Sequence, residues 1–141
     1  MSSTFTTDFA LLVLRWGTGI YMLLGHGIPK WEKFMAGLEG TEVKFYAFLG
    51  LSPLTSLGLA VLGEVVCMVA LIAGFRTRLF AIPAVITMSV AAFMTHGGDP
   101  WFARHAEGGG SKEMAILYLI PLVAILILGS GKYSIDQLLK R

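Results

Sequence analysis

The stretch that decides the fold is LVLRWGTGIYMLLGHGIPKW, residues 12–31. It is apolar enough to enter a bilayer, whose hydrocarbon core is about 30 Å thick and takes roughly 20 helical residues to cross. Arg15 nevertheless lies in the body of the stretch, and His26 and Lys30 lie at its far end. The stretch therefore predicts a membrane-spanning helix whose polar groups need partners, because a lone charge within a bilayer is costly.

The composition of the whole chain is that of a membrane protein. Of the 141 residues, 55% are hydrophobic and 14% are charged, whereas soluble domains carry about 25% charged residues. Four apolar stretches are long enough to cross a bilayer, at about residues 9–28, 54–74, 79–96 and 113–129. They predict an all-α fold in which residues 1–141 form a single integral membrane domain, a four-helix bundle.

Local signals delimit these spans. We expect Pro29 to end the first span, because proline cannot continue a helix. Ser52 and Pro53 are typical of a helix start, and Gly74 is typical of a helix end. Just after the first span, apolar residues recur at helical spacing, namely Trp31, Phe34, Met35 and Leu38. They predict a short interfacial amphipathic helix, and a loop that contains aromatic residues is the alternative.

Charge, cysteine content and the N-terminal sequence exclude several classes of protein. Residues 1–8 include no basic residue, so we expect the first span to be retained and not cleaved as a signal peptide. The net charge is +2, without a long basic run, which argues against a nucleic-acid partner. Cys67 is the only cysteine, so an intrachain disulfide and a CxxC redox pair are excluded. The tight loop with Arg76 and Arg78 favours cytoplasmic termini.

Glu64 is the only acidic residue in the body of a predicted span. Counted from the expected span ends, Glu64 and Arg15 differ in depth by only about 5 Å, so we expect an intramembrane ion pair between them. Buried pairs often fix how two helices pack without adding stability. Alternatively, intramembrane charges mark substrate or proton paths, in which case the pair lines a cavity. The sequence leaves both interpretations open.

Polar residues gather toward the side of the membrane away from the termini. Arg15 and His26 differ by only about 20° around a helix, and His96 ends the third predicted span on the same side as His26. An apolar-tailed ring such as a quinone needs one or two hydrogen-bond donors at this depth. The candidate ligand-binding residues are Arg15, Tyr21, His26, Glu64 and His96. Their spacing matches no metal-ligand or haem-ligand motif, so we expect no metal.

Several sequence features, taken in order, resemble the DoxX family of small four-helix membrane proteins. Arg15 and Gly19 lie in the first span, and Glu64 lies in the second. The longer segments that carry the resemblance are His26-Gly27-x-x-Lys30, Phe48-Leu49-Gly50-Leu51-Ser52-Pro53, Gly74-Phe75-Arg76-Thr77-Arg78 and Gly129-x-Gly131-Lys132-Tyr133-Ser134-Ile135-Asp136. The resemblance covers nearly the whole chain, and it depends on the order and spacing of the motifs more than on any single one.

The resemblance implies a protein of the bacterial inner membrane that works near quinone or thiol redox chemistry. The family takes its name from a terminal quinol oxidase system, and relatives are linked to thiosulfate:quinone oxidoreduction and to redox-stress complexes. We therefore expect a quinone-linked redox subunit or an accessory component of a membrane oxidoreductase system, with the lipid bilayer and a membrane or soluble redox protein as partners.

The alternative function is that of a non-catalytic membrane scaffold. Such a scaffold would dock a redox or stress-response partner through the loops at residues 31–50 and 97–112. The lack of a nucleotide, flavin or metal motif favours the scaffold, and the converging polar residues favour the redox subunit. Whether the chain is itself an enzyme stays open.

Overall fold

The computed structural model describes residues 3–105 and 110–139, which form helices and loops without a β-strand. The elements in chain order are α1 (Ser3–Met22), η1 (Leu23–Gly27), α2 (Ile28–Leu38), η2 (Phe48–Gly50), α3 (Pro53–Val61), η3 (Leu62–Val66), α4 (Cys67–Ala73), α5 (Thr77–Val90), η4 (Ala91–Thr95), η5 (Ala103–His105), α6 (Glu113–Leu128) and α7 (Ile135–Leu138). The elements η1, η3 and η4 are π-helical turns, and η2 and η5 are 3-10 turns.

Three helical runs in the described part of the chain are long and apolar enough to cross a membrane. They are Phe5–Leu38 with 34 residues, Pro53–Ala73 with 21 and Thr77–Thr95 with 19. Helix α6 has 16 residues, which corresponds to about 24 Å and is shorter than the hydrocarbon core of a bilayer. The protein is therefore an all-helical membrane protein with three helices of spanning length, and a fourth crossing by α6 stays a prediction.

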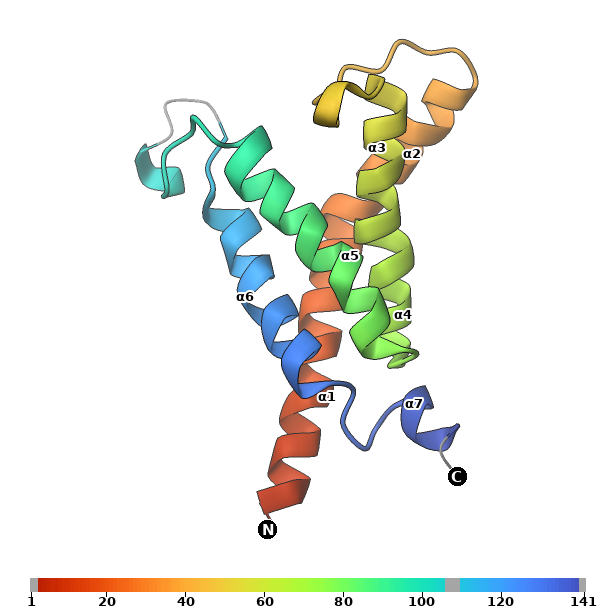
Figure 1. The fold of residues 1–141 in the computed structure, drawn as a ribbon, viewed down its shortest axis with the longest axis vertical. Coiled ribbons are helices and arrows are strands. Elements are labelled where there is room, and N and C mark those ends of the chain that lie inside the picture. The colour runs from red at the N-terminus through yellow and green to blue at the C-terminus, as the bar shows by residue number, and fades with distance from the viewer. Residues whose placement is uncertain (1–2, 106–109, 140–141) are drawn as a thin grey trace.

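The long helices lie side by side, with the start of α1 and helix α7 at one end of the molecule (Figure 1). The loops that follow α2 and η4 lie at the other end, which we call the loop end. Helix α5 packs against both α4 and α6, and α1 packs against α4 and α6. Toward the loop end, α5 leans away from α3, which packs against α2 (Figure 1). The bundle is therefore tight at the terminal end and splayed at the loop end.

The first helix does not end at Pro29, so this sequence prediction is wrong. Helices α1 and α2 are joined by η1, in which the N–H of Ile28 donates to the carbonyl of Leu23, five residues back. Pro29 then falls in the first turn of α2, where its missing N–H is tolerated. The amphipathic segment is helical, as predicted, but it continues the first helix, and Phe34 packs against Gly58 of α3.

The other expected helix boundaries are confirmed by their capping contacts. The Ser52 hydroxyl accepts a hydrogen bond of 3.1 Å from the Thr55 N–H at the start of α3. Gly74 ends α4 in the left-handed conformation, with φ of 68°, which suits a residue without a side chain. α5 begins three residues later at Thr77. The left-handed Gly74 and the short segment after it make the α4–α5 connection a tight antiparallel turn.

The buried core lies where α1, α4, α5 and α6 meet. Its members are mostly methionine, leucine and alanine, namely Met22, Cys67, Met68, Leu71, Ala81, Ala84, Met88, Leu122 and Ile125. The outer faces of the helices expose large apolar side chains, for example Leu117, Ile120 and Ile127 of α6. Extended apolar surface of this kind is typical of contact with lipid.

Candidate functional site

Arg15 and Glu64 do not form the ion pair that the sequence predicted. The Arg15 guanidinium donates to the carbonyl oxygens of Ser130 and Tyr133, the second at 2.7 Å. Glu64 instead forms an ion pair with Lys30. The two deep charges of the chain therefore have separate partners at opposite ends of the bundle.

The register of the first helix against α3 and α4 explains this difference. Gly27 packs against the carbonyl oxygen of Glu64, which a Cβ at Gly27 would approach to 2.5 Å, and Gly19 packs against Ile72. Glu64 therefore lies beside Gly27, which is roughly 18 Å along the helix from Arg15 at 1.5 Å per residue. The depth estimate from the sequence failed because it assumed that the spans begin level with one another. Helix α1 starts at Ser3 and extends past the end of α4, so that Arg15 lies beside Gly74.

The Lys30–Glu64 pair is almost hidden from solvent on its acidic side. The Lys30 ammonium contacts both carboxylate oxygens of Glu64, Oε2 at 2.6 Å. The Glu64 side chain is 1% exposed and the Lys30 side chain is 27% exposed. A lysine has three N–H donors, so the ammonium can serve the carboxylate and still donate to another group. The pair is thus a neutral unit with a spare donor.

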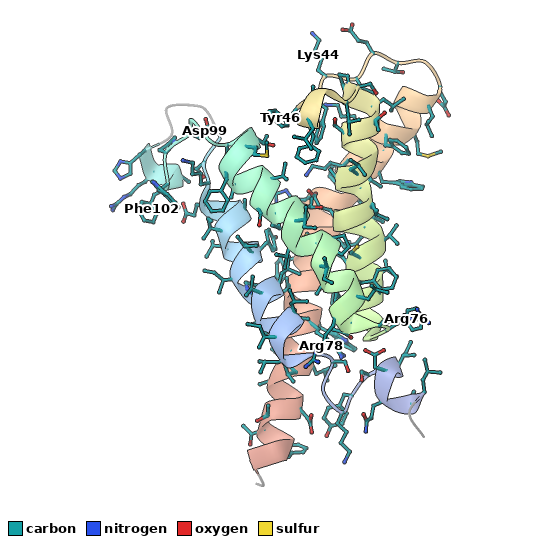
Figure 2. The ribbon with its side chains drawn as sticks, in the orientation of Figure 1. Lys44, Tyr46, Arg76, Arg78, Asp99 and Phe102 are labelled. Carbon is teal, nitrogen blue, oxygen red and sulfur yellow. The ribbon has the colours of Figure 1, made fainter. Side chains whose placement is uncertain are left out.

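A cavity of about 410 Å³ lies next to this pair, between α3, η3, α5, η4 and the segment 45–48. Its walls are mostly aliphatic and aromatic. The titratable side chains that line it are those of Lys30, Tyr46, Glu64 and His96. Figure 2 shows Tyr46 at the loop end, on the side that faces α5, with Asp99 on the neighbouring loop. The cavity therefore combines an apolar body with a polar rim near the loops.

His96 contributes to the polar rim with a fixed orientation. Its Nδ1 lies 2.7 Å from Oδ2 of Asp99. Gly110 of the returning loop lies over this contact, since a Cβ at Gly110 would approach Nδ1 to 2.6 Å. A hydrogen bond from one ring nitrogen sets the role of the other, so Nε2 is the nitrogen that His96 can offer to a ligand or to water.

The remaining candidates from the sequence, Arg15, Tyr21 and His26, are not among the residues that line the cavity. Tyr21 is 74% exposed on the outer face of α1. His26 packs edge-on against the ring of Tyr118 in α6, with 5.5 Å between the ring centroids. Glu64 and His96 are the predicted ligand-binding residues that line the cavity.

Three π-helical turns interrupt the helices that carry the polar groups of the cavity, and two of them, η3 and η4, line it. Turn η1 precedes the helix that carries Lys30, η3 contains Glu64, and η4 precedes His96. Gly63 of η3 lies so close to Thr87 of α5 that an added Cβ would overlap the threonine side chain. π-helical turns are rare and frequently occur at functional sites. Close packing on both sides therefore holds the wide turn, and with it the Glu64 carboxylate.

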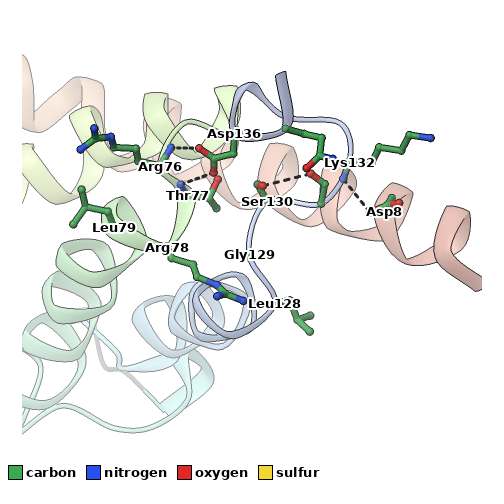
Figure 3. A pocket seen from close by; sticks show the side chains of 12 residues that line it. Asp8, Arg76, Thr77, Arg78, Leu79, Leu128, Gly129, Ser130, Lys132 and Asp136 are labelled. Atoms are coloured by element: carbon green, nitrogen blue, oxygen red, sulfur yellow. Dashed lines mark hydrogen bonds between the residues drawn. The ribbon is translucent and has the colours of Figure 1, made fainter. Parts of the chain in front are cut away.

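A second recess, of about 630 Å³, lies at the opposite end and is more polar (Figure 3). The Asp136 carboxylate accepts hydrogen bonds from the N–H groups of Arg76 at 2.6 Å and Thr77 at 3.0 Å. The Asp8 carboxylate accepts one of 2.9 Å from the N–H of Lys132. Both carboxylates thus hold the C-terminal segment in place, and we assign this recess a structural role.

The hydrogen bonds at Asp136 also decide its ionisation. Burial raises the pKa of the Asp136 carboxyl, but the hydrogen bonds from Thr77, Arg76 and Ser130 outweigh burial, so the pKa lies below its ordinary value. The ionised form is therefore the one that fits the folded chain.

Sequence reasoning missed Lys30 as the partner of Glu64 and the aromatic residues of segment 45–48. The signal for Lys30 was its i,i+4 spacing from His26. This spacing places the two side chains on one helix face only if the helix continues through Pro29. The aromatic segment has no helical or alternating period, so no pattern linked it to the membrane. Within residues 3–105 and 110–139, no three His, Cys, Asp or Glu side chains are grouped closely enough to hold a metal ion.

The fold and the site together define a small all-helical membrane protein with an apolar cavity and a neutral ion pair at its rim. Residues 10–97 match the sequence model of the DoxX family, so the chain belongs to this family. The match contains every residue that lines the cavity. An uncharacterised protein of Haemophilus influenzae is 26% identical over 140 residues, covering 89% of this chain and 87% of that protein. No solved structure matches the chain.

Proposed function

We propose that this chain is a bacterial inner-membrane protein that binds a quinone-like molecule in the cavity, as a quinone-linked redox subunit or accessory component of a membrane oxidoreductase system. The observation that carries this proposal is the apolar cavity beside the Lys30–Glu64 pair, with His96 at the same rim. Ligand sites are typically apolar pockets with a few well-placed polar groups. The membership in the DoxX family is in keeping with this role.

The apolar walls favour a ligand with a hydrocarbon tail. Leu59 and Leu62 on one wall and Ile86 on the other line the cavity and are also exposed on the outer surface of the helices. The cavity is thus continuous with surface that contacts lipid. A tail can therefore lie between the two walls while the head of the ligand reaches the polar rim.

The polar rim favours a neutral head group over an anionic one. Glu64 already neutralises the charge of Lys30, so a carboxylate or phosphate would compete with Glu64 for the ammonium. A ring carbonyl needs only a hydrogen-bond donor, which the third N–H of Lys30 supplies. Nε2 of His96 can donate or accept a hydrogen bond at the same rim, because Nδ1 is engaged by Asp99. A quinone carries redox chemistry that no side chain supplies.

The test is direct binding of a decyl-substituted benzoquinone to the purified protein in a mild detergent. We expect saturable binding that weakens at least about tenfold in His96→Phe, because one rim group is lost. His26→Phe is the matched control, since His26 packs against Tyr118 and does not line the cavity. The affinity of this variant for the quinone should equal that of the unchanged protein. Absence of saturable binding, or equal loss in both variants, would remove the proposal.

The scaffold function is kept as a second candidate because of one loop. Trp101 and Phe102 are large, exposed aromatic residues between η4 and α6, and exposed aromatic side chains are common anchors in protein interfaces. Purification in mild detergent separates the two functions. A scaffold should copurify with a partner protein and contain no bound quinone. The Trp101→Ala variant should no longer copurify with that partner.

A further inference from the structure

We infer that residues 45–48, which we call the aromatic strap, form the part of the proposed ligand site that recognises a ring. This inference rests on the proposed function and adds the source of its selectivity. The benzene-type rings that line the cavity are those of Phe45, Tyr46 and Phe48, and all three come from this short segment. The helical walls of α3 and α5 contribute aliphatic side chains instead.

The strap is held at its two ends and has no regular secondary structure between them. Residues 41–47 form no helix or strand. The Lys33 ammonium donates to the carbonyl of Lys44 at 2.5 Å, just before the strap. The N–H of Phe48 donates to the hydroxyl of Ser56 at 3.0 Å, and Ser56 itself lines the cavity. The strap can therefore adjust its rings to a ligand without losing its attachment to α2 and α3.

The turn after the strap has a strained backbone that sets its direction. Leu49 has φ of 50° and ψ of 32°, the left-handed conformation, which is unfavourable for a residue with a side chain. The Leu49 side chain is 76% exposed, so its own packing does not compensate for this strain. Strained residues of this kind persist where the surroundings require them and are common at binding sites. Here the strained turn connects the strap to the start of α3.

The strap and the aliphatic wall favour a planar ring between them. Aromatic pairs are stabilised by their ring geometry beyond the apolar area that they bury. An aliphatic ketone with the same carbonyl and tail gains only the buried area. We therefore assign the preference for ring-headed over straight-chain ligands to Phe45 and Phe48. The hydrogen bond to the carbonyl of the ligand is assigned to Lys30.

The first test compares two probes on matched variants in mild detergent. The probes are decylbenzoquinone and 2-dodecanone, an aliphatic ketone. Replacing both Phe45 and Phe48 by leucine should weaken quinone binding about tenfold, since aromatic pairing of this size corresponds to about one decade in affinity. Binding of the ketone should change less than about twofold. Phe93→Leu is the control, because Phe93 is exposed and lies outside the cavity lining.

The outcomes separate this inference from the proposed function. If the unchanged protein binds no quinone, both fall. If it binds quinone and the strap variant loses neither probe, or loses both equally, the strap has no ring selectivity and the inference alone is overturned.

The second test uses the unchanged protein, so that a misfolded variant cannot obscure the result. Lys44 is exposed and directly precedes the strap, so trypsin should cleave after it. Decylbenzoquinone should slow this cleavage severalfold by holding the strap on the ring, whereas 2-dodecanone should not. Cleavage after Arg104, in the other loop, is the internal control. Equal protection by the two probes, or no protection by the quinone, would contradict the inference.

Discussion

At the scale of single residues, Lys30 and Glu64 differ in how much solvent each can reach. Glu64 is 1% exposed and Lys30 is 27% exposed. Removing the lysine leaves a carboxylate in an apolar site, while removing the carboxylate leaves an ammonium that can turn toward the loops. We expect Lys30→Met to lower the free energy of unfolding by about 3 kcal/mol and Glu64→Gln to lower it less. The double variant should recover part of the loss in reversible detergent unfolding.

The same experiment distinguishes the observed pair from the one that the sequence suggested. Arg15 lies roughly 18 Å from Glu64 along the helix axis, and changes at distant sites add. The losses of Arg15→Met and Glu64→Gln should therefore sum in the double variant. A clear departure from additivity for Arg15 and Glu64, with additivity for Lys30 and Glu64, would contradict the structure.

Asp136 makes the stability of the terminal end depend on pH. Its folded pKa is below its unfolded value, because the hydrogen bonds outweigh the effect of burial. Its contribution is therefore fully present above the unfolded pKa, near 4, and is lost as the pH falls through the folded pKa. Asp136→Asn should destabilise the protein by about 1 kcal/mol at neutral pH, as a lost helix cap does. The difference from the unchanged protein should shrink below about pH 4 in unfolding measurements.

A control locates this acid sensitivity. Glu32 is exposed on α2, and Glu32→Gln should leave the pH profile unchanged. A profile in which Asp136→Asn tracks the unchanged protein at every pH would show that the carboxylate does not bind the start of α5 as described.

At the scale of elements, the fit of η3 against α5 depends on Gly63. A Cβ there would overlap the Thr87 side chain, so Gly63→Ala should destabilise the protein by about 1–3 kcal/mol, the usual cost of overpacking. Adding Thr87→Ala should restore part of the loss. Gly25→Ala is the matched control in another π-helical turn, where nothing lies within 4 Å. Equal effects of the two glycine changes in thermal unfolding would refute tight packing at η3.

Most element boundaries could be predicted because they depend on local chemistry. Ser52 and Gly74 act through backbone groups within a few residues of themselves, so the sequence alone carries their signal. The helix end predicted at Pro29 was wrong because it depends on more than local chemistry. The effect of the proline is absorbed by η1, and the stability of a wide turn depends on packing against another helix, as between Gly27 and Glu64.

The candidate site could be predicted only in part for a related reason. Glu64 and His96 stand out because polar residues at membrane depth are rare. Their partners depend on how far one helix slides along another, which single-helix periodicity does not contain. The roles of Lys30 and of the aromatic strap could therefore be recognised only in the three-dimensional structure.

At the scale of the whole molecule, the proposed topology has cytoplasmic termini and α6 as a fourth crossing. Lys132→Cys and Lys44→Cys should then react with a membrane-impermeant thiol reagent from opposite sides of the membrane. Native Cys67 is fully buried, so its background labelling should be low. Labelling of Lys44→Cys from the cytoplasm would reverse the orientation. Labelling of both positions from one side would mean that an even number of crossings lies between them, so that α6 does not cross the membrane.

The contact of Arg15 with the C-terminal segment has a consequence for biosynthesis. The guanidinium is almost completely buried, and its acceptors on Ser130 and Tyr133 follow it by 115 and 118 residues. The ribosome therefore delivers the first helix to the membrane long before these acceptors have been made. Until then, the Arg15 guanidinium in the first helix of the nascent chain lacks these two carbonyl acceptors. A chain that ends before Ser130 keeps this unpaired guanidinium within the membrane. Membrane quality control can therefore recognise the truncated chain by a charge that is buried in the full-length protein.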